Sequence, residues 1–263
     1  MILASHGIIG SQITQFVGLL DTYSGAAAAY SLRKLRSAYT GSSIKVRRAS
    51  DNTEQDIGFV NNELDTTSLA SFCSGTNGFV TTWYDQSGNG NDATQTTASD
   101  QPQIVSSGSV ILDNGKPSIQ FDNTNDFLNT STFTSLSNAS YFMVSHLNIG
   151  SGSGDYSYIF STANSGFPIQ SLAKRHNDGA DANTRYIFDG LSSHIDGVNT
   201  LNQELASLFF PTSSPYLNLY INNSVQSFVS TPSSAVEPSN KSINIGRYSA
   251  GTTHYLDLSL IHI

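Results

Sequence analysis

Short stretches in which apolar and polar residues alternate recur along most of this chain, and they constrain its fold more than any other feature. Examples are GFVTTWYD at 78–85, KPSIQFD at 116–122 and YINNSVQSF at 220–228. An alternation with a period of two is typical of β-strands that bury one face. Glycine, asparagine and serine separate the stretches, and Asn222 and Asn223 suit the positive φ of a hairpin turn. The pattern predicts an all-β protein, an antiparallel β-sandwich.

Two segments depart from this alternation. Residues 21–41, DTYSGAAAAYSLRKLRSAYTG, offer capping residues at the start, a run of alanines and Gly41 as a stop, and they predict a helix. Residues 64–73, LDTTSLASFC, are a candidate for a short helix capped by Asp65 or Thr66. We therefore expect the sandwich to carry one N-terminal helix.

The charge balance disfavours several classes of partner. Charged residues make up 12% of the chain and the formal net charge is −8, which argues against nucleic-acid binding. Six of the twelve basic residues cluster between Arg33 and Arg48, where we favour a solvated face over a phosphate-binding patch. No apolar run reaches the ~18 residues of a membrane span, and the N-terminus lacks the basic start of a signal peptide. The surface that this composition predicts is polar but largely uncharged, which is common in extracellular and virion proteins. We therefore predict an extracellular or virion-associated location.

The chain predicts one domain, because no break in composition divides it. We assign residues 1–17 to a lead-in segment and residues 18–257 to the β-sandwich. The last six residues, LSLIHI at 258–263, resemble the translation of a transposase end sequence used in sequencing libraries. We therefore predict that these six residues are a non-native tail.

Several motifs, taken in order, resemble known families. YDQSGNGNDATQ, GKPSIQFDNTNDFL and INIGRY followed by YLD resemble the laminin-G-like, concanavalin-type jelly-roll modules. The first hundred residues also resemble the catalytic domain of α-L-arabinofuranosidase B, through AAYSLRKLRSAYTGSSIKVRRASDN and LASFCSGTNGFVTTWYDQSGNGNDATQ. The first resemblance implies a concanavalin-like jelly roll. The second implies a retaining glycoside hydrolase, provided that the catalytic residues are present.

The second resemblance also implies where those catalytic residues should stand. The family's glutamate nucleophile lies in a segment of the kind FDYGNAE, and its counterpart FSTANSG puts Gly166 in that place. The aspartate acid/base follows a late strand, and the counterpart NIGRYS puts Tyr248 there. Retaining glycosidases need two carboxyl groups about 5–5.5 Å apart. Since no carboxylate occurs between Ser161 and Arg175, we predict that the catalytic pair is lost and that the chain is not an enzyme.

The only cysteine, Cys73, follows Phe72 in an apolar setting. A lone cysteine of this kind is usually a small buried hydrophobic residue. The resemblance to arabinofuranosidase B implies a cysteine pair, and Gly78 stands at the position of the near partner. The family's pairing is therefore absent from this chain.

The loop DQSGNGND at 85–92 has two interpretations. Asp85, Asn89 and Asp92 space oxygen ligands as a calcium loop does, although Thr96 stands where an EF-hand has its glutamate. Calcium is the one cofactor that the sequence suggests. We favour the second interpretation, in which asparagine and glycine take turn conformations and Asp85 caps turn amides.

Aromatic and polar side chains near the loops are the candidate ligand-binding residues. Trp83 and Tyr84 point to opposite faces of one strand, so one packs in the core and the other is free to stack on a sugar. Rigid sandwiches place recognition on loops. The candidates that the loops contribute are Asp85, Asn125, Asp126, Arg175 and His176.

These observations lead to one predicted function and two alternatives. We predict a non-catalytic β-sandwich that binds a polysaccharide, a cell-surface glycan or a protein partner, in a setting such as a phage tail or virion appendage. The first alternative is an active α-L-arabinofuranosidase whose carboxylates come from other positions, namely Asp155, Asp178, Asp181 and Asp189. The second is a structural spacer that forms a homo-oligomer in a fibre.

Overall fold

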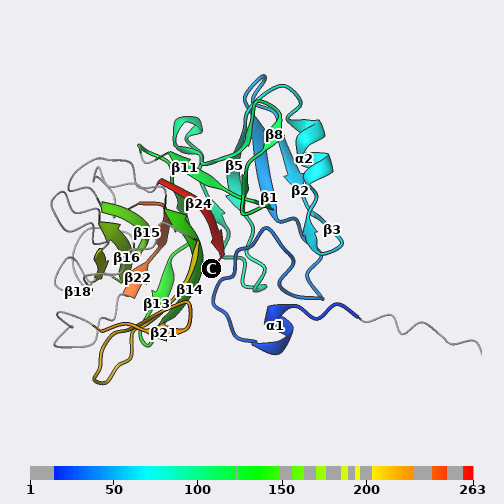
Figure 1. The fold of residues 1–263 in the computed structure, drawn as a ribbon. Helices are drawn as coiled ribbons and strands as arrows, with labels where there is room; N and C mark the ends of the chain where they lie inside the picture. The colour runs from blue at the N-terminus through cyan, green and yellow to red at the C-terminus, as the bar shows by residue number, and fades with distance from the viewer. Residues whose placement is uncertain are drawn as a thin grey trace, which may run out of the picture.

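The computed structural model shows an all-β protein, as the alternating pattern predicts (Figure 1). It describes residues 15–122, 124–147, 156–162, 170–175, 185–188, 193–195, 203–227, 239–247 and 257–262. Within these ranges the helical segments are short: α1 (Leu19–Thr22), α2 (Thr66–Phe72) and the 3₁₀ helix η1 (Ala98–Asp100). In the part of the chain that is described, no helix is both long and apolar enough to cross a membrane.

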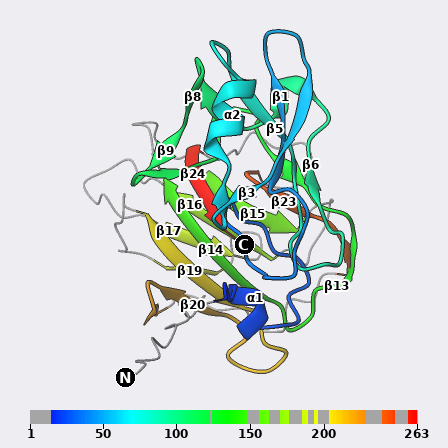
Figure 2. The ribbon, with the colours of Figure 1, turned by 90° about the vertical axis from the view of Figure 1, so that its right-hand side faces the viewer.

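One continuous run of antiparallel strands has the order β2, β1, β5, β7, β11, β24, β14, β19, β20, β21. The bounds are β1 (Ile44–Arg48), β2 (Glu54–Ile57), β5 (Gly78–Trp83), β7 (Gln103–Ser106), β11 (Gln120–Asp122), β14 (Ser140–Leu147), β19 (Glu204–Phe209), β20 (Asn218–Ile221), β21 (Ser224–Val225) and β24 (Asp257–His262). Strand β7 also pairs with β8 (Ser109–Val110) through its last two residues. Figure 2 shows β14, β19 and β20 side by side in this run.

A second antiparallel run starts from the same strand β5 and has the order β6, β12, β23, β15, β16, β17, β18. The bounds are β6 (Ala93–Thr94), β12 (Leu128–Asn129), β23 (Ile243–Ile245), β15 (Tyr156–Thr162), β16 (Ser171–Arg175), β17 (Arg185–Phe188) and β18 (Ser193–Ile195). Three small pairs complete the described strands: β3 (Phe59–Val60) with β4 (Glu63–Leu64), β9 (Leu112–Asp113) with β10 (Lys116–Pro117), and β13 (Phe133–Ser135) with β22 (Ser239–Lys241).

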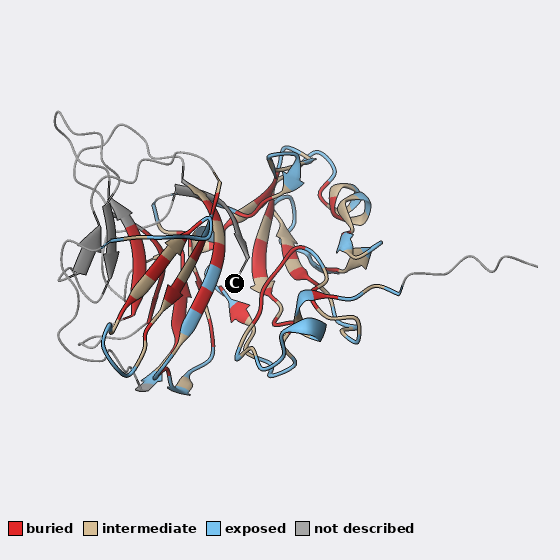
Figure 3. Cartoon of the chain, turned by 60° about the horizontal axis from the view of Figure 1, so that its bottom comes forward, coloured by how far each residue is buried: buried red, intermediate tan, exposed pale blue. Residues whose placement is uncertain are grey.

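The two runs pack face to face over a single apolar core (Figure 3). Tyr141 of β14 stacks on Phe160 of β15 with ring centroids 4.4 Å apart, and Phe210 meets Tyr141 edge-on at 6.0 Å. Along β19 every second residue is buried, as the period of two requires. The hairpin at Asn222 and Asn223 is also confirmed, since both residues have positive φ between β20 and β21.

The predicted N-terminal helix over residues 21–41 is wrong. Only the four residues of α1 are helical there, and the alanine run that follows is irregular. The short helix at 64–73 is confirmed as α2, whose N-cap Asp65 accepts a hydrogen bond of 3.0 Å from the Ser68 amide.

The alanine run fails to form a helix because side chains from the loop at 85–92 bind its backbone. The Ala29 amide donates to Asp85 at 2.8 Å, and the Asn89 amide group donates to the carbonyl of Ala26 at 2.9 Å. Gln86, which is fully buried, donates to the carbonyl of Ser31 at 2.9 Å. Further bonds of the same kind involve Asn91 with Ala27, and Gln86 with Arg33 and Leu35. These tertiary hydrogen bonds satisfy the backbone groups that a helix would pair internally, so local propensity is overridden.

The C-terminal strand β24 lies between β11 and β14 (Figure 1). Phe121 of β11 is paired with Leu258, and His146 of β14 with Ser259. The foreign origin of residues 258–263 and the division of the chain into a lead-in and one sandwich domain stay predictions.

Candidate functional site

A row of polar side chains crosses four neighbouring strands of the second run and ends on β6. Cross-strand pairs place its members next to one another, in the order Ser171, Ser161, Asn244, Asn129, Thr94. The residues beside them in each strand belong to the apolar core: Leu172, Phe160, Ile245 and Leu128. Because successive side chains of a strand point to opposite faces, the polar row lies on the face turned away from that core.

Three of the five residues of this polar row are buried, although they do not belong to the apolar core. Ser161, Ser171 and Asn244 have no solvent exposure. Ser161 donates to the carbonyl oxygen of Arg247 at 2.9 Å. Within the described ranges, both polar atoms of the Asn244 side chain, Oδ1 of Asn129 and Oγ of Ser171 have no hydrogen-bond partner. A buried polar group left unpaired costs about 1–3 kcal/mol, so this concentration makes the row a candidate site.

The row also joins the two segments that the resemblance singled out for catalysis. FSTANSG begins on β15 and NIGRYS begins on β23, and these strands pair directly, with Ser161 opposite Asn244. The structure therefore brings together two segments that lie about 80 residues apart in sequence. Gly166 and Tyr248 themselves fall outside the described residues. The substitute carboxylates of the enzyme alternative also fall there: Asp155, Asp178, Asp181 and Asp189.

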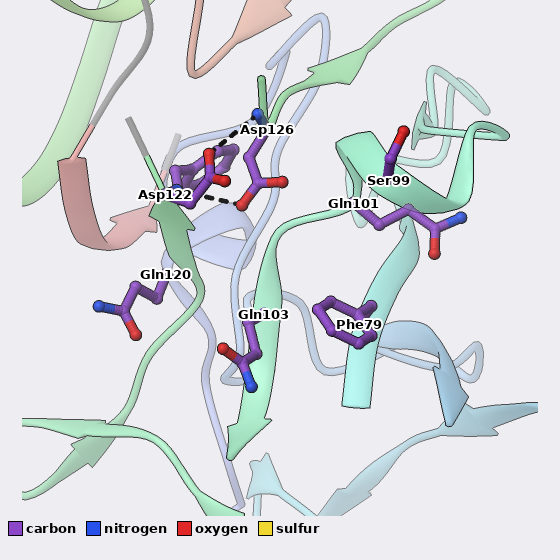
Figure 4. A pocket seen from close by; sticks show the side chains of 8 residues that line it. Phe79, Ser99, Gln101, Gln103, Gln120, Asp122 and Asp126 are labelled. Atoms are coloured by element: carbon purple, nitrogen blue, oxygen red, sulfur yellow. Dashed lines mark hydrogen bonds between the residues drawn. The ribbon is translucent and has the colours of Figure 1, made fainter. Parts of the chain in front are cut away.

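A cavity of about 350 Å³ is carried by other strands of the molecule (Figure 4). Its lining is Phe79, Ser99, Gln101, Gln103, Gln120, Phe121, Asp122 and Asp126. Asp126 is only 5% exposed, and burial, followed by the charge of Asp122, raises the pKa of its carboxyl to about 8. Asp122 Oδ1 accepts backbone N–H groups from Thr124, Asn125 and Asp126. The turn therefore places a buried carboxyl group with a raised pKa at the edge of the cavity.

The predicted ligand-binding residues do not gather at one site. Trp83 is fully buried against Tyr30, so its prediction as a sugar platform is wrong and it serves the core instead. Tyr84, on the opposite face, donates its hydroxyl to Asp56 at 2.6 Å. The Asn125 side chain is held by the Ser99 carbonyl, and Asp126 lines the cavity. Arg175 ends β16, and His176 lies beyond the described part of that strand.

The carboxylate of Asp85 holds the loop at 85–92 together through hydrogen bonds to backbone and side-chain groups. Oδ1 of Asp85 accepts the amides of Ala29 and Ser87, and Oδ2 accepts the Ser87 hydroxyl and the Asn91 amide. Asp92 accepts the amide of Asp85 at 2.9 Å. No cluster of three or more histidine, cysteine or acidic side chains suited to a metal occurs in the described ranges. Calcium binding by Asp85, Asn89 and Asp92 stays a prediction.

Cys73 is buried and free, as its apolar setting suggests. A Cβ atom built on Gly78 would lie 2.6 Å from the Cys73 sulfur. The two positions that the family resemblance pairs are therefore adjacent in space.

Part of the chain matches a known protein family. Residues 21–117 match the family model described as Alpha-L-arabinofuranosidase B, catalytic. The probable alpha-L-arabinofuranosidase B of Aspergillus flavus is 38% identical over 96 residues, which cover 34% of this chain and 19% of that protein. The alpha-L-arabinofuranosidase B of Aspergillus oryzae gives the same values. The chain thus spans about a fifth of the length of these curated relatives.

Solved structures extend the likeness over the whole fold. A mutant GH54 α-L-arabinofuranosidase soaked with 4-nitrophenyl α-L-arabinofuranoside has a TM-score of 0.74 at 16% identity, covering 94% of this chain and 61% of that one. An arabinofuranosidase complexed with arabinofuranosyl-α-1,2-xylobiose has a TM-score of 0.65 at the same identity and coverage. At this identity the likeness shows the fold. The N-terminal part of the chain is similar to the catalytic domain of α-L-arabinofuranosidase B.

This result overturns the predicted non-catalytic function. The prediction rested on two positions, Gly166 and Tyr248, placed by a weak resemblance in the second half of the chain. The family match confirms the resemblance of the N-terminal part over residues 21–117, and together with the fold it favours the enzyme alternative. The polar row could not be predicted from the sequence. Asn244 and Ser161 alternate with core residues as any solvent-facing side chains would, and only the cross-strand register reveals the row they form.

Proposed function

We propose that this chain is a glycoside hydrolase of the α-L-arabinofuranosidase type, acting on arabinose-containing polysaccharide. The observation that carries the proposal is the match of residues 21–117 to the arabinofuranosidase B catalytic model. The shared fold over 94% of the chain supports it. The proposal includes a retaining mechanism, a concanavalin-like jelly-roll topology and an extracellular location, where such polysaccharides occur.

The polar row supplies the substrate-binding surface in this proposal. A furanose ring presents hydroxyl groups that both donate and accept hydrogen bonds. Asn244 offers an amide donor and an acceptor, Asn129 offers a carbonyl oxygen, and Ser171 a hydroxyl, all buried and without partners in the described part of the chain. A sugar bound there would satisfy these groups, and their burial in a site of low dielectric strengthens each bond.

Hydrolysis with retention requires a carboxylate nucleophile and a carboxylic acid about 5–5.5 Å apart. The candidates that the sequence offers are Asp155, Asp178, Asp181 and Asp189, which flank β15, β16 and β17 in sequence. One of them would attack the anomeric carbon of the arabinofuranosyl residue while a second protonates the departing oxygen. Water then cleaves the glycosyl–enzyme bond and restores both groups.

The test is hydrolysis of 4-nitrophenyl α-L-arabinofuranoside, measured as 4-nitrophenol, together with release of arabinose from arabinoxylan. We expect turnover of both substrates by the wild-type chain. Asn244→Ala should lower kcat/KM by at least tenfold, and the Asp→Asn variant of each catalytic carboxylate by several orders of magnitude. Gln55→Ala, on the exposed side of β2, is the matched control and should leave turnover unchanged. Absence of turnover with both substrates by the folded wild-type chain would refute the proposal.

A further inference from the structure

The cavity near Asp126 is built from a flat strand surface and one wall. Phe79, Gln103 and Gln120 lie side by side across β5, β7 and β11, because Gln103 is paired with both of the others. The wall comes from η1 and the residue after it, and from the turn between Asp122 and Asp126 (Figure 4). A hollow of about 350 Å³ has the size of a small-molecule site, and its lining is more polar than that of most such sites.

Asp126 is the buried polar group of this cavity. Its Oδ2 accepts the Asp122 amide at 3.1 Å. No group in the described ranges donates a hydrogen bond to Oδ1, and Figure 4 shows the carboxyl group facing the space that the labelled side chains surround. Because burial favours its neutral form, the carboxyl group can donate one hydrogen bond to a ligand and accept another.

The lining argues against a charged ligand. It contains no basic side chain. The nearby guanidinium of Arg47 lies over the Phe79 ring at 4.9 Å and donates to Gln101 at 2.7 Å, so it supports the wall. A cation is equally unsuited, because Oδ1 of Asp122 already accepts three backbone N–H groups. What remains is a neutral ligand with many hydroxyl groups and an apolar C–H face, which is the chemistry of a sugar.

The turn that carries Asp126 also contacts the end of β23. Its backbone carbonyl oxygen would lie 3.1 Å from a Cβ atom at Gly246, and the next residue, Phe127, has the Arg247 guanidinium over its ring at 3.3 Å. Strand β23 carries Asn244 of the polar row. The turn that borders the cavity therefore contacts the residues that directly follow the strand of Asn244, which links the cavity to the polar row as two subsites for a polymer would be linked.

We propose that this cavity is a second saccharide subsite, which binds one sugar residue of the polysaccharide through Asp126, Gln120 and Phe79. The carboxyl and amide groups hold hydroxyls, and the aromatic ring packs against the C–H face of the sugar. The inference rests on the proposed function for the identity of the polymer. The binding of a neutral oligosaccharide is independent of turnover.

The experiment is calorimetric titration of arabinoxylan-derived oligosaccharides into wild type, Gln120→Ala, Asp126→Asn and the control Gln55→Ala. The loss of one hydrogen bond corresponds to about three- to tenfold weaker binding for each cavity variant. The ratio of kcat/KM for arabinoxylan to kcat/KM for 4-nitrophenyl α-L-arabinofuranoside should fall by the same factor. Gln120 is exposed and its side chain has no hydrogen bond in the described ranges, so its removal tests the site without loss of the fold.

The outcomes separate the two proposals. Cavity variants that bind oligosaccharide as wild type does, or a wild-type chain that binds none, overturn the subsite. Turnover of the nitrophenyl substrate in either case would leave the proposed function standing. Weakened binding by the Gln120→Ala variant in a chain without any turnover would support the subsite and refute the enzyme.

Discussion

Replacing Gly78 by cysteine should create a disulfide with Cys73 in a protein that has no other cysteine. A Cβ atom at position 78 would lie 2.6 Å from the Cys73 sulfur. In a disulfide the Cβ atoms are about 3.8 Å apart and the sulfurs about 2.05 Å, so a sulfur at position 78 reaches Cys73 after a small shift of the crowded side chains. The same Cβ would lie 3.1 Å from side-chain carbons of Val46 and Val105, which makes the site crowded.

The stability of the Gly78→Cys protein depends on a steric cost and on the stabilisation that the disulfide provides. The crowding should cost about 1–3 kcal/mol, and Gly78→Ser, which has similar volume and cannot form the bond, measures that cost alone. Closing the short loop from 73 to 78 should restore about 2 kcal/mol in the chain-entropy model. The oxidised Gly78→Cys protein should therefore melt on the order of 4–8 °C above its reduced form.

The assay is thermal unfolding of Gly78→Cys with and without reductant, combined with thiol titration under denaturing conditions. We expect no free thiol in the oxidised protein and one in wild type. Gly78→Ser should melt near the reduced Gly78→Cys protein. Two free thiols after oxidation, or an oxidised form that melts below the reduced form, would show that positions 73 and 78 are not adjacent as described.

Three further perturbations test other parts of the structure. Gln86→Ala removes the hydrogen bonds that its side chain makes with the Leu35 amide and the Arg33 and Ser31 carbonyls, although Ser31 keeps its bond from the Ser43 hydroxyl, so it should lower the free energy of unfolding in urea by about 3 kcal/mol; a loss below about 1 kcal/mol would mean that water replaces the side chain. Gly246→Ala should cost several kcal/mol in the same assay, because the residue has φ of +94° and its Cβ would lie 2.5 Å from the Phe121 ring; near-neutrality would contradict this packing. The raised pKa of Asp126 means that the folded state binds more protons than the unfolded state between about pH 4 and pH 8. Its contribution to stability is therefore present at low pH and is lost as pH rises toward 8, and Asp126→Asn should flatten this dependence; equal pH slopes for both proteins would refute it.

The strands were the most predictable part of the fold, because a half-buried strand carries its periodicity in its own sequence. The hairpin at 222–223 and the cap at Asp65 are local features, and both are confirmed. The helix over 21–41 failed for a non-local reason. Its backbone is bound by Asp85 and Gln86, whose role no pattern within 21–41 discloses.

The candidate sites divide in the same way. Asp126 was foreseen because an Asp-rich turn after a strand is a local signal. Its partners Gln103 and Gln120 were not, since only the pairing of β7 with β11 places them together. The burial of Trp83 was one of two outcomes that alternation allowed, and the register of β5 between β1 and β6 decided it.

The hydrogen bonds between the alanine run and the loop at 85–92 have a consequence for folding during synthesis. Ala29 and Asp85 are 56 residues apart, so the N-terminal segment leaves the ribosome well before its partner exists. At about 5–20 residues per second, the delay is on the order of 3–11 s. During that time the alanine-rich stretch is free to sample the helix that its composition favours, and this transient structure must unwind before the loop captures it. The alanine run therefore cannot reach its native form until the loop at 85–92 has been synthesised.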